Sequence, residues 1–189
     1  MHSLATYLRE LRDIRSSGAN VSETSFYGPL ANLLSDVGRT LKPRVRCIIH
    51  PKNQGAGIPD GGFFTADQLP RTGEPDLHAP LPARGVMEVK AAGDDAWQTA
   101  RSAQVARYLD TYGQVLVTNY RDFVLLGRDA SGKRVELEAF FARFAADQAV
   151  QYLPHLVQSC CEEVITRSRG HHRSRLPKSC SVRWDFLSL

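Results

Sequence analysis

Asp60, Glu88 and Lys90 are the residues whose types and spacing could support chemistry. Asp60 lies in a segment, 58–66, whose pattern predicts a β-strand, and Glu88 and Lys90 lie in a second one, 85–91. Glu88 and Lys90 are two residues apart, so an extended strand places their side chains on the same face. Burying such charges in an otherwise apolar strand is unfavourable by several kcal/mol per ion unless they are paired. A functional role would account for that cost.

The chemistry that these residues suggest is metal-assisted hydrolysis. Asp60 and Glu88 offer carboxylate oxygens, and the peptide carbonyl of Val89 offers another, which together suit Mg²⁺ or, as an alternative, Mn²⁺. A metal and the Lys90 ammonium can together lower the pKa of an attacking water and neutralise the charge that develops on a phosphodiester. The competing interpretation is that Glu88 and Lys90 form an exposed pair on an edge strand and that Asp60 begins a turn.

The first half of the chain contains the elements that must position these residues. Apolar residues at helical spacing predict a helix over 3–16, ended by Gly18. A second helix follows, capped by Ser22 or Thr24, and Pro29 requires its regular part to begin only just before that residue. The pattern then predicts three strands at 44–50, 58–66 and 85–91, with a loop over 67–83.

The second half continues with a helix that Asp94 or Asp95 can cap. The predicted elements are this helix at 96–111, strands at 114–119 and 122–128, a weaker strand at 134–140 and a helix at 139–153. The order of helices and strands predicts an α/β fold in which a mixed central sheet is flanked by helices. Trp97, Tyr108 and Tyr112 are expected in the core of that fold, in preference to a platform for stacking bases.

Length and charge favour one compact domain over 1–150 and a basic, poorly ordered tail over 151–189. The chain has 189 residues, 42% of them hydrophobic, and a net charge of +4. Residues 167–189 carry six bases and one acid, a net charge of +5, which leaves −1 for the remainder. A polyanionic partner must therefore be argued from local sites and not from bulk charge.

The sequence gives no sign of membrane insertion or secretion. It has no run of about 18 apolar residues, and its N-terminus lacks the apolar stretch of a signal peptide, so we expect a cytoplasmic protein. The four cysteines are expected to be reduced and structural. A zinc site can be drawn from the tail, but its spacing matches no closed structural site; its ligands would be Cys160, Cys161, His171, His172 and Cys180.

With Pro59-Asp60 followed by Glu88-Val89-Lys90, the sequence resembles the PD-(D/E)xK nuclease superfamily, whose core runs helix, three strands, helix, strand. The resemblance implies Mg²⁺-dependent hydrolysis of double-stranded DNA, with Asp60 and Glu88 as metal ligands and Lys90 positioning or activating water. It also implies two further site residues. Glu23 lies where many members carry an additional acidic ligand, and Gln104 lies where restriction enzymes often have a glutamine that faces the site.

Each of these two added residues has a simpler interpretation. Glu23 could be a helix-capping carboxylate favoured by the helix dipole, and Gln104 could occupy a solvated helix position. Arg101 and Arg107 flank Gln104 and could contact phosphate, although a solvated face is the simpler expectation for them as well.

Over roughly residues 3–145, the sequence is similar to the N-terminal nuclease region of single-chain restriction-modification proteins (type IIG or single-polypeptide type I). The stretches that carry this similarity are ETSFYGPLANLL, QGAGIPDGGFFTADQ, RGVMEVKAAGDDAWQTARSAQVARYL and VLVTNYRDFVLLG. Such proteins also carry an adenine-specific DNA methyltransferase and sometimes a helicase. Motifs for AdoMet binding, adenine methylation and P-loop helicases do not occur in this sequence. The alternatives are a nuclease whose methyltransferase or helicase subunit is encoded separately, a non-catalytic module that binds DNA or a subunit, and an unstable truncated fragment.

Overall fold

A six-stranded sheet carries the fold in the computed structural model, which describes residues 4–18, 22–69 and 80–141, without the side chains of residues 140 and 141. The strands are adjacent in the order in which they occur in the chain. The β3–β4 pair is parallel and the other four pairs are antiparallel, so the sheet is mixed. Its members are β1 (Val45–Ile49), β2 (Gly61–Thr65), β3 (Val86–Val89), β4 (Val115–Thr118), β5 (Asp122–Arg128) and β6 (Arg134–Phe141).

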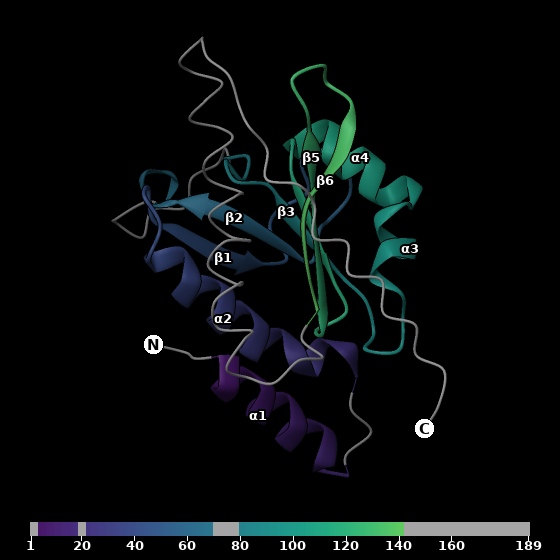
Figure 1. Cartoon of the computed structure of the whole chain (residues 1–189). Coiled ribbons are helices and arrows are strands. Elements are labelled where there is room, and N and C mark those ends of the chain that lie inside the picture. Colours follow the sequence, from purple (N-terminus) through teal and green to yellow (C-terminus); the bar gives the residue numbers. More distant parts are fainter. Residues whose placement is uncertain (1–3, 19–21, 70–79, 142–189) are drawn as a thin grey trace.

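Helices flank the sheet, with α1 and α2 on one side and α3 and α4 on the other (Figure 1). The helical elements are α1 (Leu4–Ser16), η1 (Glu23–Phe26), α2 (Tyr27–Arg39), η2 (Ala66–Gln68), α3 (Ala96–Ala100) and α4 (Ala103–Tyr112). This mixed α/β arrangement confirms the predicted fold class and is consistent with a restriction-endonuclease-like core. Among the described residues, no helix has the length and apolarity needed to cross a membrane.

Strand β3 lies inside the sheet and contributes to both cores. Met87 and Val89 pack in the apolar cluster with α1 and α2, whereas Val86 packs in the cluster with α3 and α4. All three side chains are fully buried, and burying each contributes about 1.5–3 kcal/mol. Because side chains alternate along a strand, Glu88 shares the face of Val86. The apolar neighbours therefore fix the direction of the Glu88 carboxylate.

Gly85 sets the start of β3. Its φ of +87° lies in the left-handed region, which side chains other than glycine rarely adopt. A Cβ atom at this position would lie 2.5 Å from the backbone oxygen of Gln114, the residue before β4. The close approach lets Val86 N–H donate to that same oxygen at 3.1 Å and begins the parallel pairing with β4.

The first-half predictions differ from the structure mainly at element ends. Helix α1 ends before Gly18, whose φ is +69°, as predicted. The predicted side-chain cap of the second helix is wrong, because the short 3₁₀ helix η1 precedes α2 and Ser22 makes no capping hydrogen bond. Pro29 falls in the first turn of α2, where its missing N–H is tolerated. Strand β2 begins at Gly61, so Asp60 lies just before the strand and not within it.

In the second half, the single helix predicted over 96–111 is two helices. Asp95 caps α3, as expected, by accepting from the backbone N–H of Trp97. Ser102 has an extended backbone and caps α4 by accepting from Val105 N–H, which separates the two helices. Residues 139–141 belong to β6, so the helix predicted over 139–153 does not begin there. The rest of that helix, the proposed tail and the possible zinc ligands lie outside the described residues.

Candidate active site

Asp60 lies where the pairing between β2 and β3 ends. Gly61 is opposite Met87 in this antiparallel pair, so two further residues of pairing would place Pro59 opposite Val89. Instead the chain turns away, and the Val89 N–H donates to Asp60 Oδ2 at 2.7 Å. The aspartate side chain thus accepts a hydrogen bond at the place where the pairing would have continued.

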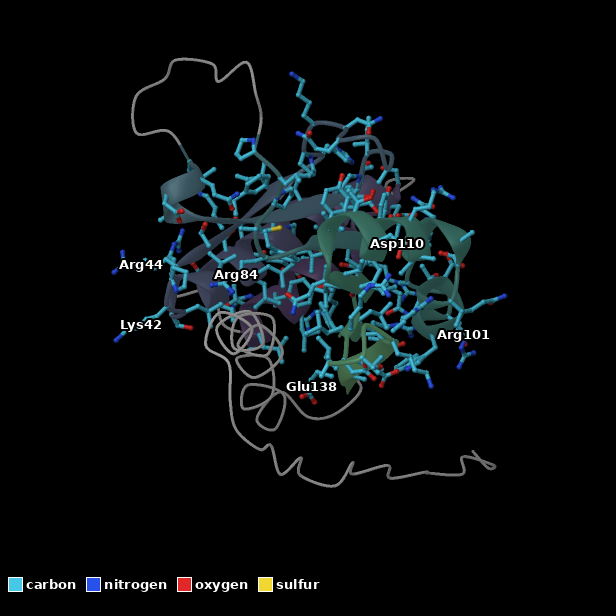
Figure 2. The ribbon with its side chains drawn as sticks, turned by 90° about the horizontal axis from the view of Figure 1, so that it is seen from above. Lys42, Arg44, Arg84, Arg101, Asp110 and Glu138 are labelled. Carbon is cyan, nitrogen blue, oxygen red and sulfur yellow. The ribbon has the colours of Figure 1, made fainter. Side chains whose placement is uncertain are left out.

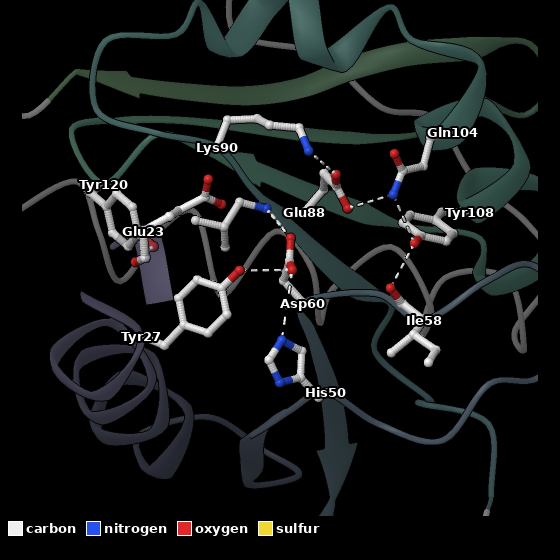
Figure 3. A network of polar contacts seen from close by, with 11 residues as sticks. Glu23, Tyr27, His50, Ile58, Asp60, Glu88, Lys90, Gln104, Tyr108 and Tyr120 are labelled. Carbon is white, nitrogen blue, oxygen red and sulfur yellow. Dashed lines mark hydrogen bonds and ion pairs between the residues drawn. The ribbon is translucent and has the colours of Figure 1, made fainter. Parts of the chain in front are cut away.

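The other oxygen of Asp60 faces the start of α2. The Tyr27 phenol donates to Asp60 Oδ1 at 2.8 Å. His50, directly after β1, brings its Nε2 to 4.0 Å from the same oxygen, and its side chain is 53% exposed. The His50 backbone N–H also donates to the Asp60 backbone oxygen at 3.0 Å. Three separate elements therefore converge on Asp60 (Figure 3).

Glu88 and Lys90 form an ion pair at the end of β3. Lys90 Nζ donates to Glu88 Oε1 at 2.7 Å, and the Glu88 side chain is only 2% exposed. Strand β3 has neighbours on both sides, so the alternative of an exposed pair on an edge strand is wrong. The Lys90 N–H donates to Thr118 O at 2.9 Å, which holds the lysine in the sheet just beyond the strand.

Gln104 reaches Glu88 from α4. Its Nε2 donates to Glu88 Oε2 at 3.2 Å and to the Tyr108 phenol at 3.1 Å. Gln104 and Tyr108 are four residues apart, so they share one face of the helix. The Tyr108 phenol in turn donates to the backbone oxygen of Ile58 at 3.0 Å. This chain of contacts ties the segment before Asp60 to α4 (Figure 3).

Glu23 approaches the site from η1. The Tyr120 phenol donates to the Glu23 backbone oxygen at 2.6 Å, and the buried Tyr7 phenol donates to the Tyr120 backbone oxygen at 2.8 Å. Tyr120 has a φ of 70°, uncommon for a residue with a side chain. The carboxylate of Glu23 is close enough to Asp60 and Lys90 for their charges to shift its pKa.

The charges of the site are unevenly balanced. Burial, the largest cause, raises the pKa of Glu88; Lys90 opposes this shift, and the charges of Asp60 and Glu23 add to it. Burial and the charge of Asp60 also raise the pKa of Glu23. For Lys90, burial alone would lower the pKa, but Glu88, Asp60 and Glu23 outweigh it and raise the pKa. When ionised, the three carboxylates and one ammonium carry a formal charge of −2, which a divalent cation would offset.

The tyrosines of the site remain protonated donors near neutral pH. Burial, followed by the hydrogen bond to Asp60 and its charge, raises the pKa of the Tyr27 phenol. Burial likewise raises the pKa of Tyr108 and of Tyr120. These phenols therefore act through hydrogen bonds, and none of them is poised to serve as a base.

A pocket of about 260 Å³ opens beside Lys90, at the break between α3 and α4. Two acids, four uncharged polar residues and the lysine surround it, namely Lys90, Asp94, Asp95, Gln98, Thr99, Ser102 and Gln104. The pocket gives the Lys90 ammonium access to solvent, in keeping with the 38% exposure of its side chain. A solvent-borne group can therefore reach the ion pair.

The donor set suits a magnesium ion in its chemistry. Asp60 and Glu88 supply hard oxygen ligands, and Mg²⁺ is often held by one or two carboxylates with water completing its shell. Within the described ranges, no group of three or more His, Cys, Asp or Glu side chains is gathered as a metal cluster. The fit therefore rests on two carboxylates and the Val89 backbone, with Glu23 nearby.

The residues expected from the sequence are brought together with some exceptions. Asp60, Glu88, Lys90 and Gln104 join one network, and the Val89 backbone takes part. Arg101 does not share a helix with Gln104, because it is the C-cap residue directly after α3, and both Arg101 and Arg107 are exposed.

Sequence reasoning missed Tyr27 and His50, and it missed the polar role of Tyr108. Tyr108 is buried in the core as expected, with a side chain 1% exposed, yet its phenol enters the site. Its spacing of four residues from Gln104 was a usable signal. For Tyr27 and His50, no signal in the sequence pointed to Asp60.

Comparison with known proteins bears on the fold alone. No protein-family model matches the chain, and no curated protein matches it. Among solved structures, it is similar to a chain in the cryo-electron-microscopy structure of a DrdV–DNA complex, with a TM-score of 0.54 and 20% sequence identity. The likeness covers 82% of this chain and 13% of that chain. The protein therefore shares its fold with a small part of a much longer chain that was solved in complex with DNA.

Proposed function

We propose that this chain is a Mg²⁺-dependent DNA endonuclease module of a restriction-modification system, which hydrolyses phosphodiester bonds. The observation that carries the proposal is the buried Glu88–Lys90 ion pair at the end of a central strand, beside the Asp60 carboxylate. Burying a carboxylate at 2% exposure opposes folding unless it is compensated. The surrounding polar network provides partial compensation, and a catalytic role explains why the carboxylate is there.

The backbone of β3 supports Val89 as a ligand. Lys90 N–H donates to Thr118 of β4, and successive peptide groups of a strand point to alternate sides. The N–H and carbonyl of Val89 therefore point away from β4 and toward Asp60, which already accepts from the N–H. Asp60, Glu88 and the Val89 carbonyl would hold the ion. When bound, Mg²⁺ would lower the pKa of water and neutralise charge on a phosphodiester.

Lys90 acts as a fixed positive charge in this proposal. Its raised pKa keeps the ammonium protonated at neutral pH, so it can donate to a phosphate oxygen or to an attacking water but cannot accept a proton. Gln104 holds the second oxygen of Glu88, which limits rotation of that carboxylate. Glu23 adds negative charge close to Asp60 and Lys90, and it is the further ligand in this proposal.

The fold likeness to a chain that was solved with DNA supports DNA as the substrate. This chain spans only 13% of that chain, so target selection would require regions beyond this fold. A methyltransferase or helicase subunit is the class of partner that we propose for that purpose.

Cleavage of supercoiled plasmid with Mg²⁺, Mn²⁺ or EDTA tests the function. We expect nicking or linearisation with either metal and none with EDTA. Asp60→Asn, Glu88→Gln and Lys90→Met should each lower the rate by about 10²-fold or more, the usual cost of losing one group that stabilises transition-state charge. Asp67→Asn is the matched control, because this exposed acid lies at the other end of β2 and should leave the rate unchanged. Activity that persists in EDTA or in all three site variants would contradict the proposal.

A non-catalytic DNA-binding module is the second candidate, and one observation favours it. All four carboxylate oxygens of Asp60 and Glu88 already accept hydrogen bonds from the protein itself. Such a network could be purely structural. Binding of duplex DNA without cleavage in either metal, with unchanged binding in Glu88→Gln, would favour this candidate over the endonuclease.

A further inference from the structure

Among the described residues, one segment combines several positive charges with no acid. Residues 37–59 contain no aspartate or glutamate and five formal cations, which are Arg39, Lys42, Arg44, Arg46 and Lys52. Arg39 is paired with Asp36, one turn earlier on α2. Within the described residues, no ion pair includes Lys42, Arg44 or Arg46. We refer to Lys42, Arg44 and Arg46 as the basic edge; their charges have no ion-pair partner in the described part of the chain.

The basic edge follows the outermost strand of the sheet. Val45 and Cys47 of β1 are buried against α2, whereas Arg44 and Arg46 are exposed on the alternate positions. Lys42 is also exposed, and it projects beside Arg44 at one side of the molecule, away from Arg101 and Asp110 (Figure 2). Because β1 is the first strand in the sheet order, no other described strand covers its outer side.

The opposite edge of the sheet carries charges of both signs. Strand β6 contains Arg134 together with Glu136 and Glu138, and Lys133 precedes it, so residues 133–138 have no net charge. Residues 37–59, which include the whole of β1, carry only positive formal charge. A polyanion would therefore be attracted more to the β1 edge than to the β6 edge.

The basic edge also leads to the candidate active site. Strand β1 ends at Ile49, and His50 follows with its Nε2 4.0 Å from Asp60 Oδ1. At about 3.3 Å per residue, Arg46 and Arg44 lie roughly 13 and 20 Å along the strand from His50. Duplex DNA advances about 3.4 Å per base pair, so these spans correspond to about four to six base pairs.

We propose that the basic edge binds the phosphate backbone of double-stranded DNA about four to six base pairs from the bond that the active site would cleave. The cleavage distance rests on the proposed function, whereas binding to the duplex does not. Contacts of this kind carry no sequence information, but they orient a protein on DNA and make its affinity depend on salt. The competing role for these charges is protection of an edge strand against pairing with another chain.

The test compares two double variants that have the same change in net charge. Arg44→Glu/Arg46→Glu reverses two charges of the basic edge, and Arg9→Glu/Arg12→Glu reverses two exposed arginines of α1. The first variant keeps charged side chains on β1, and the second leaves β1 unchanged. Protection of this edge strand against pairing with another chain is therefore preserved in both. Fluorescence anisotropy with a labelled duplex of about 30 base pairs in EDTA, between about 50 and 200 mM salt, measures binding without cleavage. Urea unfolding of both variants checks that each is folded.

We expect Arg44→Glu/Arg46→Glu to weaken DNA binding by about tenfold or more. The magnitude of the slope of log K against log salt concentration should fall by roughly 2, because each lost phosphate contact lowers that magnitude by about 0.9. The α1 variant should stay within about twofold of the wild-type protein. Equal weakening by both variants, unchanged binding by the first, or absence of duplex binding by the wild-type protein would overturn the proposal. If the wild-type protein binds DNA through this edge but does not cleave it, only the proposed endonuclease function is contradicted. If the wild-type protein cleaves DNA and Arg44→Glu/Arg46→Glu binds as well as the wild type, only the proposed role of the basic edge is contradicted.

Discussion

Asp60 and Glu88 belong to one network but are held in different ways. Asp60 accepts from two uncharged donors, the Tyr27 phenol and the Val89 N–H. Glu88 is more deeply buried and accepts from the Lys90 ammonium and from the Gln104 amide. The Asp60 half of the site thus depends on where the backbone and a helix end are placed, whereas the Glu88 half depends on a charge. The two halves should therefore respond differently to substitution and to pH.

Removal of the charge from the Glu88 half should have the largest effect on stability. Lys90→Met keeps the length of the side chain but leaves the Glu88 carboxylate buried with only an amide donor. Breaking a buried pair costs about 3–5 kcal/mol, and the 38% exposure of the lysine reduces this to about 1–3 kcal/mol. Urea unfolding at neutral pH measures the loss. In a Glu88→Gln background the same substitution should cost far less, and an equal cost in both backgrounds would show that the two residues are not coupled.

Loss of an uncharged donor from the Asp60 half should have a smaller effect. Tyr27→Phe removes the hydrogen bond to Asp60 Oδ1, while the Val89 N–H still holds the other oxygen. We expect the free energy of unfolding to fall by about 1 kcal/mol, the usual net contribution of one such bond. The same substitution made in Asp60→Asn should cost less. A loss larger than that of Lys90→Met would reverse the proposed difference between the halves.

The smallest expected effect is on the dependence of stability on pH. Because burial raises the folded-state pKa of Glu88, its contribution to stability is fully present below its ordinary pKa and is lost as pH rises through the raised value. The wild-type protein should therefore lose stability relative to Glu88→Gln as pH rises above about 4.5, with no further change once the folded-state pKa is passed. Urea unfolding across this range gives the comparison. A difference that moves in the opposite direction would mean that Lys90 outweighs burial.

The sequence was sufficient to find the Glu88 half of the site. The alternation of side chains along a strand places Glu88 and Lys90 on one face. A carboxylate within an apolar strand can also be recognised from the sequence without a structure. The fold class followed from the order of helical and strand patterns for the same reason. Gln104 was reached through resemblance to a nuclease superfamily, and the structure places its amide at Glu88.

The sequence was less informative about the Asp60 half. Asp60 was expected within a strand, but β2 begins only at Gly61, so Asp60 lies just before it. Tyr27 and His50 are 33 and 10 residues from Asp60, and their contacts depend on how α2 and β1 pack against the sheet. The break at Ser102 was also missed, because the apolar spacing of one continuous helix and of two consecutive helices is nearly the same.

By itself, the sequence determined the periodicity of the strands, the placement of Glu88 and Lys90 on one face, and the absence of acids among the five cations of residues 37–59. These properties depend on spacing of a few residues, which local backbone geometry translates directly into direction. Only the tertiary structure decided that Val89 and Tyr27 hold Asp60, and that the positive charge follows β1, the first strand of the described sheet, which leads to Asp60. Contacts between distant segments depend on how whole elements pack, and packing is a property of the folded chain.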